Sequence, residues 1–257
     1  MFDLYDYSVL TIILIGLVPI LGASEIGWRL GSRGDARGGQ STSTLAGAML
    51  GLLALLIGFT FAMALSRFEA RRDAVLHEAN AIGATVLRAR LLAEPHRSET
   101  QRLLREYLQL RLDIAKSGTS LDERKSVVDR SNVLQALLWQ QAKAAVASDS
   151  GIVTGLFIQA LNGMVDTQQQ RLAAVRNRIP NMVLFTLFSL AAIAAGFAGY
   201  ASGLEARRTR LPVYVMGVLV LTVILVILDL DRPSDGFITN NQQPMLDLAG
   251  NIAAFSD

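Results

Sequence analysis

The chain has no cysteine, and only two of its 257 residues are histidine. The absence of cysteine excludes a disulfide framework, a thiolate nucleophile and a cysteine-ligated metal site. His77 and His96 have no partner at ligand spacing, and no phosphate-binding glycine loop, nucleophile elbow or HExxH motif is present. We therefore expect no enzymatic activity, no metal and no other cofactor. Basic residues are interspersed with acidic ones at helical spacing, which argues against nucleic-acid binding.

Charged residues are also missing from four long apolar stretches, and 51% of the chain is hydrophobic. An uncharged helix of about 20 residues can cross the roughly 30 Å hydrocarbon core of a lipid bilayer. The sequence therefore predicts an integral membrane protein. A charged residue inside a span would have indicated a proton relay or a transporter site, so the uncharged spans argue against a proton-coupled transporter. The four predicted transmembrane helices cover residues 7–24, 45–65, 179–204 and 211–228.

The second apolar stretch continues beyond the membrane without a helix breaker as far as about residue 94. A rod of about 50 residues would be roughly 75 Å long at 1.5 Å per residue. Pro95 ends this rod, and the pairs Ser98 with Gln101 and Ser120 with Glu123 resemble the capping boxes of two further helices.

Apolar residues recur at helical spacing throughout the soluble region, and no alternating strand pattern is visible. The predicted fold is therefore all-α, with a helical soluble region between transmembrane helices two and three. The predicted domains are residues 1–66 (helices one and two), 67–178 (soluble region), 179–230 (helices three and four) and 231–257 (polar tail).

Small residues recur at a spacing of four in two of the spans. Gly47 and Gly51 form a GxxxG pattern, and Ala195, Gly199 and Gly203 share one stripe. Such spacing favours close helix–helix packing in membranes.

Charges gather at the ends of two spans. Glu25 and Arg29 have the spacing of a helical ion pair, and we expect an interfacial role for both. The last span ends in acidic residues that could bind a hard cation, but interfacial acids partnered by Arg232 are the simpler interpretation. This membrane-edge motif comprises Asp229, Asp231, Arg232 and Pro233.

One apolar stripe on the second span is a candidate pore neck. If several copies surround an axis, such a stripe forms a hydrophobic constriction that gates by dewetting. Basic residues directly after it would attract anions to the pore mouth. The simpler alternative is an ordinary membrane helix with basic flanks. The predicted neck is Leu52, Leu55, Phe59 and Met63, and the predicted basic collar is Arg67, Arg71 and Arg72.

Two segments resemble the bacterial bestrophin-like domain family of membrane proteins, which is distantly similar to bestrophins. They are residues 56–72, LIGFTFAMALSRFEARR, and residues 228–238, LDLDRPSDGFI. Bestrophins are pentameric anion channels with four membrane helices per subunit. The resemblance implies a homo-oligomer, pentameric by that likeness, in a bacterial inner membrane. It places Phe59 at the pore neck, and it places the soluble region and the termini in the cytoplasm.

The sequence departs from the bestrophin pattern at both segments. Glu69 stands where a tryptophan is usual, and residues 231–236 replace an Asn-Pro-Phe-Gly segment, so the calcium clasp of the animal channels is not carried over. Arginines near span ends do not settle the sidedness, because six lie on one side and seven on the other. The leading hypothesis is an oligomeric ion channel for small anions. The alternative is a non-conducting sensor or scaffold whose helical region binds a partner or ligand.

Overall fold

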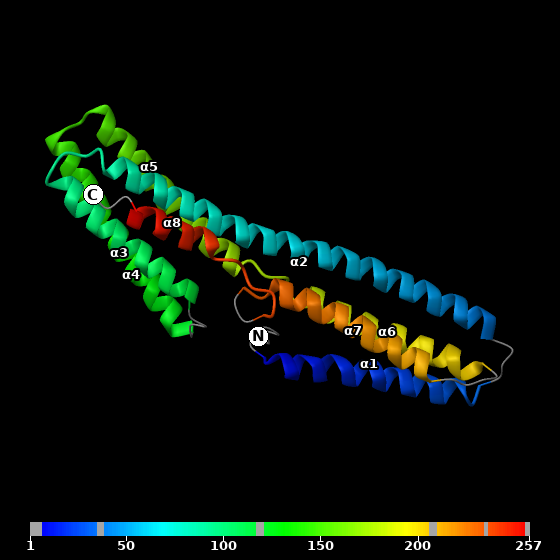
Figure 1. Ribbon diagram of the computed structural model, residues 1–257. Coiled ribbons are helices and arrows are strands. Elements are labelled where there is room, and N and C mark those ends of the chain that lie inside the picture. Colours follow the sequence, from blue (N-terminus) through cyan, green and yellow to red (C-terminus); the bar gives the residue numbers. More distant parts are fainter. Residues whose placement is uncertain (1–6, 35–38, 117–120, 206–209, 234–235, 255–257) are drawn as a thin grey trace. The chain divides into compact units, whose positions relative to one another are not determined.

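The structure is a computed structural model that describes residues 7–34, 39–116, 121–205, 210–233 and 236–254. Every regular element in these ranges is a helix, which confirms the all-α prediction (Figure 1). The helices are α1 (Val9–Gly31), α2 (Gly39–Ala89), α3 (His96–Lys116), α4 (Leu121–Ser148), α5 (Ile152–Arg176), α6 (Asn181–Leu204), α7 (Leu211–Asp231) and α8 (Gln243–Ala254).

The chain divides into two compact units. The first, here called the membrane unit, comprises Met1–Arg67, Arg178–Arg232 and Gly236–Ile238. The second, here called the bundle unit, comprises Phe68–Asn177, Pro233–Asp235 and Thr239–Asp257. Helix α2 is uninterrupted from Gly39 to Ala89, so its first part belongs to the membrane unit and its last part to the bundle unit.

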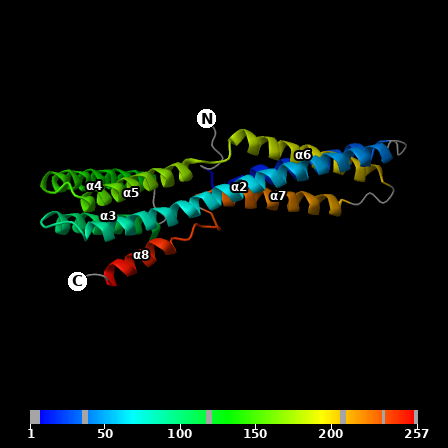
Figure 2. The same cartoon turned by 90° about the horizontal axis from the view of Figure 1, so that it is seen from above.

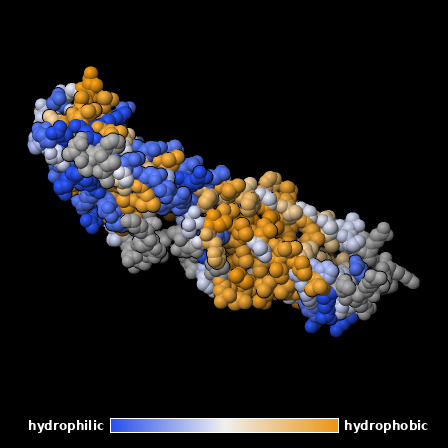
Figure 3. Space-filling model, in the orientation of Figure 1, coloured by the Kyte–Doolittle hydropathy of each residue, from blue (hydrophilic) through white to orange (hydrophobic). Residues whose placement is uncertain are grey.

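Four helical segments are long and apolar enough to cross a membrane, and each overlaps one of the four predicted spans. Within the membrane unit, α1 packs against α6 and α7, and α6 packs against α7 (Figures 1 and 2). Figure 3 shows a broad apolar surface over this unit. Such a surface is suited to lipid or to another subunit, because a bilayer solvates apolar side chains and water does not.

Glycines allow α1 and α6 to approach at backbone distance. A Cβ atom added to Gly199 would lie 2.2 Å from the carbonyl oxygen of Ser24, and one added to Gly203 would lie 2.5 Å from that of Trp28. The predicted packing stripe on α6 is therefore confirmed. Gly47 and Gly51 of the GxxxG pattern have no described atom within 4 Å of such a Cβ, so no packing in the single chain uses them.

The bundle unit has its own apolar core. Buried side chains of α2 to α5 meet there, including Ile82, Tyr107, Leu138 and Leu161, and α8 contributes the fully buried Met245. Helix α4 packs between α3 and α5, so the three lie side by side (Figures 1 and 2). The apolar residues that recur at helical spacing in the soluble region therefore pack helix on helix.

The start of α3 corrects one prediction. Ser98 is not an N-cap, because α3 already begins at His96. The carboxylate of Glu94 takes the capping role instead, since its Oε2 accepts hydrogen bonds from the backbone N–H of Ser98 at 3.3 Å and from its hydroxyl at 2.7 Å. The second predicted capping box begins at Ser120, which lies outside the described residues.

Candidate pore helix and its buried charges

Helix α2 has one face buried within the chain along its whole length. Residues seven apart return to nearly the same side of a helix, because seven residues are close to two turns. Ala46, Leu53 and Thr60 follow this spacing and are all at most 5% exposed, and Ala64 continues the stripe at 0%. We call this side the buried stripe of α2.

The predicted neck residues lie on a different side of α2 and are uncovered in the single chain. Their exposed fractions are large for apolar side chains: Leu52 51%, Leu55 54%, Phe59 63% and Met63 39%. In helical projection at about 100° per residue they lie within a sector of roughly 80°, whose centre is about a third of a turn from the buried stripe. The chain therefore brings the four side chains together on one open face, and their role as a neck stays a prediction.

The three arginines of the predicted collar point in different directions. Arg71 lies on the buried stripe and is 2% exposed, whereas Arg67 is half-buried and Arg72 is exposed. Successive helical residues are turned by about 100°, so Arg71 and Arg72 cannot share a face. The three side chains therefore do not form one basic cluster next to the neck stripe.

Two other ionisable residues lie farther along α2 on the same side as the predicted neck. His77 follows Phe59 by 18 residues, and this is five turns at about 3.6 residues per turn. Asp73 lies about 40° from the same line, and both side chains are exposed. Asp73 was not predicted from the sequence, although it follows Phe59 by 14 residues, or about four turns.

Deep in the bundle unit, the carboxylate of Glu78 lies between two arginines. Its Oε1 is 2.8 Å from Nε of Arg111, and its Oε2 accepts a hydrogen bond from Arg171. The side chain of Glu78 is 0% exposed, that of Arg111 3% and that of Arg171 10%. This cluster joins α2, α3 and α5, and Arg171 also donates to Oε1 of Gln242 at 3.2 Å, just before α8.

A neutral hydrogen-bond network continues from the charged cluster. The hydroxyl of Tyr107 donates to Oε1 of Gln168 at 2.9 Å, and Nε2 of Gln135 donates to the same oxygen. Burial raises the pKa of Tyr107 to about 12, and the nearby negative charge of Glu78 adds to this shift. The phenol therefore remains a neutral hydrogen-bond donor at physiological pH.

The carboxylates of the membrane-edge motif accept hydrogen bonds from backbone N–H groups. The two carboxylate oxygens of Asp229 accept the N–H groups of Phe237 and Ile238, both at 2.8 Å. Oδ2 of the fully buried Asp231 accepts the N–H of Ile179 at 2.8 Å, which ties the end of α7 to the start of α6.

Arg232 and Pro233 complete the motif. Arg232 is also buried and donates to the carbonyl of Tyr7 at 2.9 Å. Pro233 is half-buried at the end of the motif. Among the residues that the structure describes, no three histidine or acidic side chains gather as metal ligands.

The ion pair predicted at the end of the first span is confirmed and is part of a larger cluster. Arg29 Nε lies 2.7 Å from Oε1 of Glu25, and the hydroxyl of Tyr214 donates to Oε2 of the same carboxylate. The guanidinium of Arg210 lies 3.6 Å from the centre of the Trp28 ring, which is a cation–π contact.

The fold and its long, partly uncovered helix define a polytopic helical membrane protein with an attached helical bundle. A family model described as the Bestrophin-like domain matches residues 29–245. The chain therefore belongs to the bestrophin-like family. Comparison with curated proteins gives no match.

Solved structures of low sequence identity share the fold. A variant of a bacterial bestrophin homologue from Klebsiella pneumoniae is 16% identical with a TM-score of 0.66, over 95% of this chain and 99% of that chain. A crystal structure of the homologue phased by zinc anomalous scattering is 16% identical with a TM-score of 0.62, over 94% and 97%. A crystal structure described only as a membrane protein is 16% identical with a TM-score of 0.64, over 94% and 98%.

Proposed function

We propose that the chain is one subunit of a homo-oligomeric ion channel in which α2 lines the pore. The observation that carries this proposal is the open face of α2, where four large apolar side chains are 39% to 63% exposed while the buried stripe is covered. Membership of the bestrophin-like family supports the same assignment. Copies of α2 around an axis would turn this face into an apolar constriction that gates by dewetting.

Leu52, Leu55, Phe59 and Met63 form the neck in this proposal, and small anions are the permeant ions that the bestrophin resemblance implies. The same resemblance implies a pentamer in the bacterial inner membrane. The positions of Arg67, Arg71 and Arg72 give anion selectivity no separate support, because Arg71 is buried. Asp73 and His77 on the neck side of α2 are therefore the charges to test for ion selectivity.

Ion flux through reconstituted liposomes tests the proposal directly. Phe59→Ala removes the most exposed neck side chain, so it should widen the constriction and raise the flux. Phe61→Ala is the matched control, because Phe61 is also exposed but is turned by about 200° from Phe59. Flux that responds equally to both substitutions would refute the assigned neck. Absence of flux from the intact oligomer would refute the channel and favour the non-conducting sensor or scaffold.

The proposal also places the bundle unit and the termini in the cytoplasm. Because the chain has no cysteine, Gln140→Cys introduces a single thiol at an exposed position of α4. A membrane-impermeant maleimide should label this variant only after the cells are lysed. Labelling of intact cells would place the bundle unit outside and overturn the orientation.

A further inference from the structure

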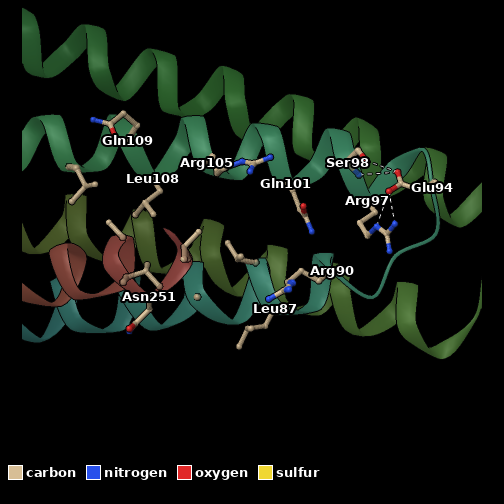
Figure 4. A pocket seen from close by; sticks show the side chains of 16 residues that line it. Leu87, Arg90, Glu94, Arg97, Ser98, Gln101, Arg105, Leu108, Gln109 and Asn251 are labelled. Carbon is tan, nitrogen blue, oxygen red and sulfur yellow. Dashed lines mark hydrogen bonds and ion pairs between the residues drawn. The ribbon is translucent and has the colours of Figure 1, made fainter. Parts of the chain in front are cut away.

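A pocket of the bundle unit has a volume of about 880 Å³ and takes no part in the proposed pore (Figure 4). Its lining mixes charged, amide and aliphatic side chains, for example Arg105, Gln109 and Leu108 on α3, so it favours no one class of ligand. The membrane unit has a more selective arrangement of side chains where α1 ends and α7 begins.

This arrangement centres on Glu25, whose carboxylate faces two arginines. Oε1 of Glu25 lies 2.7 Å from Nε of Arg29 and 3.8 Å from Nη1 of Arg210. The other carboxylate oxygen accepts a hydrogen bond from the hydroxyl of Tyr214. Two guanidinium groups therefore share one carboxylate, and the four side chains carry a surplus of one positive charge.

Both arginines keep most of their hydrogen-bond donors available. A guanidinium has five N–H donors. Toward the residues that the structure describes, Arg29 uses only Nε and Arg210 makes no side-chain hydrogen bond. Their side chains are 66% and 47% exposed, and the contact with the Trp28 ring holds the guanidinium of Arg210 in place. Planar guanidinium groups with open donors match the oxygen atoms of a phosphate.

The cluster lies at the ends of the two membrane spans. Residues 7–24 and 211–228 carry no charge, so Glu25 and Arg210 are the charged residues that border these stretches. Tryptophan, which Trp28 supplies here, is enriched at the headgroup level of membrane proteins. The phosphate groups of phospholipids occupy the same level.

An apolar strip on α1 leads from Arg29 toward the middle of the span. Residues seven, eleven and fourteen positions before Arg29 lie within about 40° of it around the helix. Gly22 is the first, and a Cβ atom added to it would have no neighbour within 4 Å. Val18 and Ile15 follow, and they are 64% and 43% exposed. The single chain leaves this strip uncovered, so it is open to an acyl chain.

The sequence around the cluster is basic. Residues 25–37 and 205–210 together contain six arginines and three acidic residues. A positive surplus at a bilayer surface attracts anionic phospholipids.

From this arrangement we propose that Arg29 and Arg210 bind the phosphate of an anionic phospholipid whose acyl chain lies along Gly22 and Val18 of α1. The phosphate accepts hydrogen bonds from the donors that Glu25 leaves open, and it balances the positive surplus. The acyl chain covers the apolar strip below Arg29.

Tryptophan fluorescence tests the site on the full chain. The chain has two tryptophans, so Trp139→Phe leaves Trp28, which contacts Arg210, as the single emitter. This variant is placed in phosphatidylcholine nanodiscs that contain a small fraction of lipid with brominated acyl chains. Bromine quenches tryptophan only at close range, so the quenching reports how strongly that lipid binds beside Trp28. Brominated phosphatidylglycerol should bind at least about tenfold more strongly than brominated phosphatidylcholine.

Three arginines provide matched variants in this background. Arg29→Gln and Arg210→Gln should each lower the preference for phosphatidylglycerol about fivefold, because each removes one charge beside the phosphate. Arg29→Lys keeps the charge and should keep most of the preference. Arg33→Gln is the control, because Arg33 is exposed just after α1 and has no described contact with Glu25. It should change the preference by less than about twofold.

Inorganic phosphate, added at constant ionic strength, separates the two sources of the phosphate group. Unchanged quenching by brominated phosphatidylglycerol would support a ligand held in the bilayer. Displacement of the brominated lipid would assign the two arginines to a free phosphate and overturn the lipid proposal.

Equal quenching by the two brominated lipids would also overturn the proposal. So would equal effects of Arg29→Gln and Arg33→Gln, because they would indicate a diffuse surface charge instead of a site. Ion flux is not a readout here, so the result is independent of the proposed channel function.

Discussion

The buried cluster around Glu78 allows the sharpest test of how the bundle unit is stabilised. Glu78→Gln keeps the shape of the side chain but leaves Arg111 and Arg171, which are 3% and 10% exposed, without their carboxylate. Removing one partner of a buried ion pair costs about 3–5 kcal/mol, because the remaining charge is buried without compensation. One kcal/mol corresponds to roughly 2–4 °C in Tm for a chain of this size, so we expect Tm to fall by about 10 °C.

The assay is thermal unfolding of the purified protein in detergent, followed by circular dichroism at 222 nm. Glu99→Gln is the matched control, because its carboxylate pairs with Arg102 on the surface, where an ion pair contributes little. Arg111→Gln and the double variant complete a mutant cycle. The double variant should be less destabilised than the sum of the two single variants, because removing Arg111 relieves one of the two uncompensated charges. A Tm for Glu78→Gln equal to that of the control, or strict additivity in the cycle, would refute this reasoning.

Three further predictions concern other parts of the chain. Gly199→Ala should destabilise the membrane unit by about 1–3 kcal/mol, because the new methyl group meets the Ser24 carbonyl, whereas Gly22→Ala, with open space around it, should not lower Tm. The pKa of Tyr107 is raised from 10 to about 12, so the neutral phenol stabilises the fold below pH 10, and this contribution is lost as the pH rises through 12. Phenolate absorbance near 295 nm, compared between wild type and Tyr107→Phe, should show this tyrosine titrating near pH 12, and titration near pH 10 would contradict its burial. Asp73→Asn should shift the reversal potential of the reconstituted channel toward greater anion permeability, whereas Arg72→Gln, at an exposed position about 140° from Phe59 around α2, should leave it unchanged.

Much of the fold follows from local patterns that the sequence displays. The four apolar stretches and the helical periodicity between them are enough to predict the spans, because a bilayer requires long uncharged helices. Pro95 correctly separates α2 from α3. The N-terminus of α3 was wrongly predicted at Ser98. A capping box such as Ser98 with Gln101 is only one way to satisfy the first backbone N–H groups of a helix. Glu94, outside the helix, accepts the N–H of Ser98 instead.

The membrane-edge motif depends on contacts between distant parts of the chain, which local sequence patterns do not reveal. Asp231 is fully buried because it accepts the N–H of Ile179, a residue 52 positions earlier in the chain. The sequence shows the acidic residues but not the backbone groups that they contact. From the sequence alone, these residues are therefore compatible with either a cation site or a structural role. The close approach of α1 and α6 was partly predictable from the stripe of Gly199 and Gly203, but the partner helix was not.

The burial of charged residues on α2 could have been predicted from the seven-residue spacing of its buried stripe. Continuing from Ala64 in steps of seven reaches Arg71, Glu78 and Thr85, and each is at most 2% exposed. Their polarity suggests solvent exposure when each residue is considered alone, whereas the register of the helix requires burial. Because a buried charge needs a partner, this conflict predicts arginines on neighbouring helices for Glu78. Arg111 and Arg171 meet that requirement from α3 and α5. The same helix thus carries an open apolar side in the membrane unit and a buried charged side in the bundle unit, and a substitution at Glu78 should affect stability while one at Phe59 should affect ion flow.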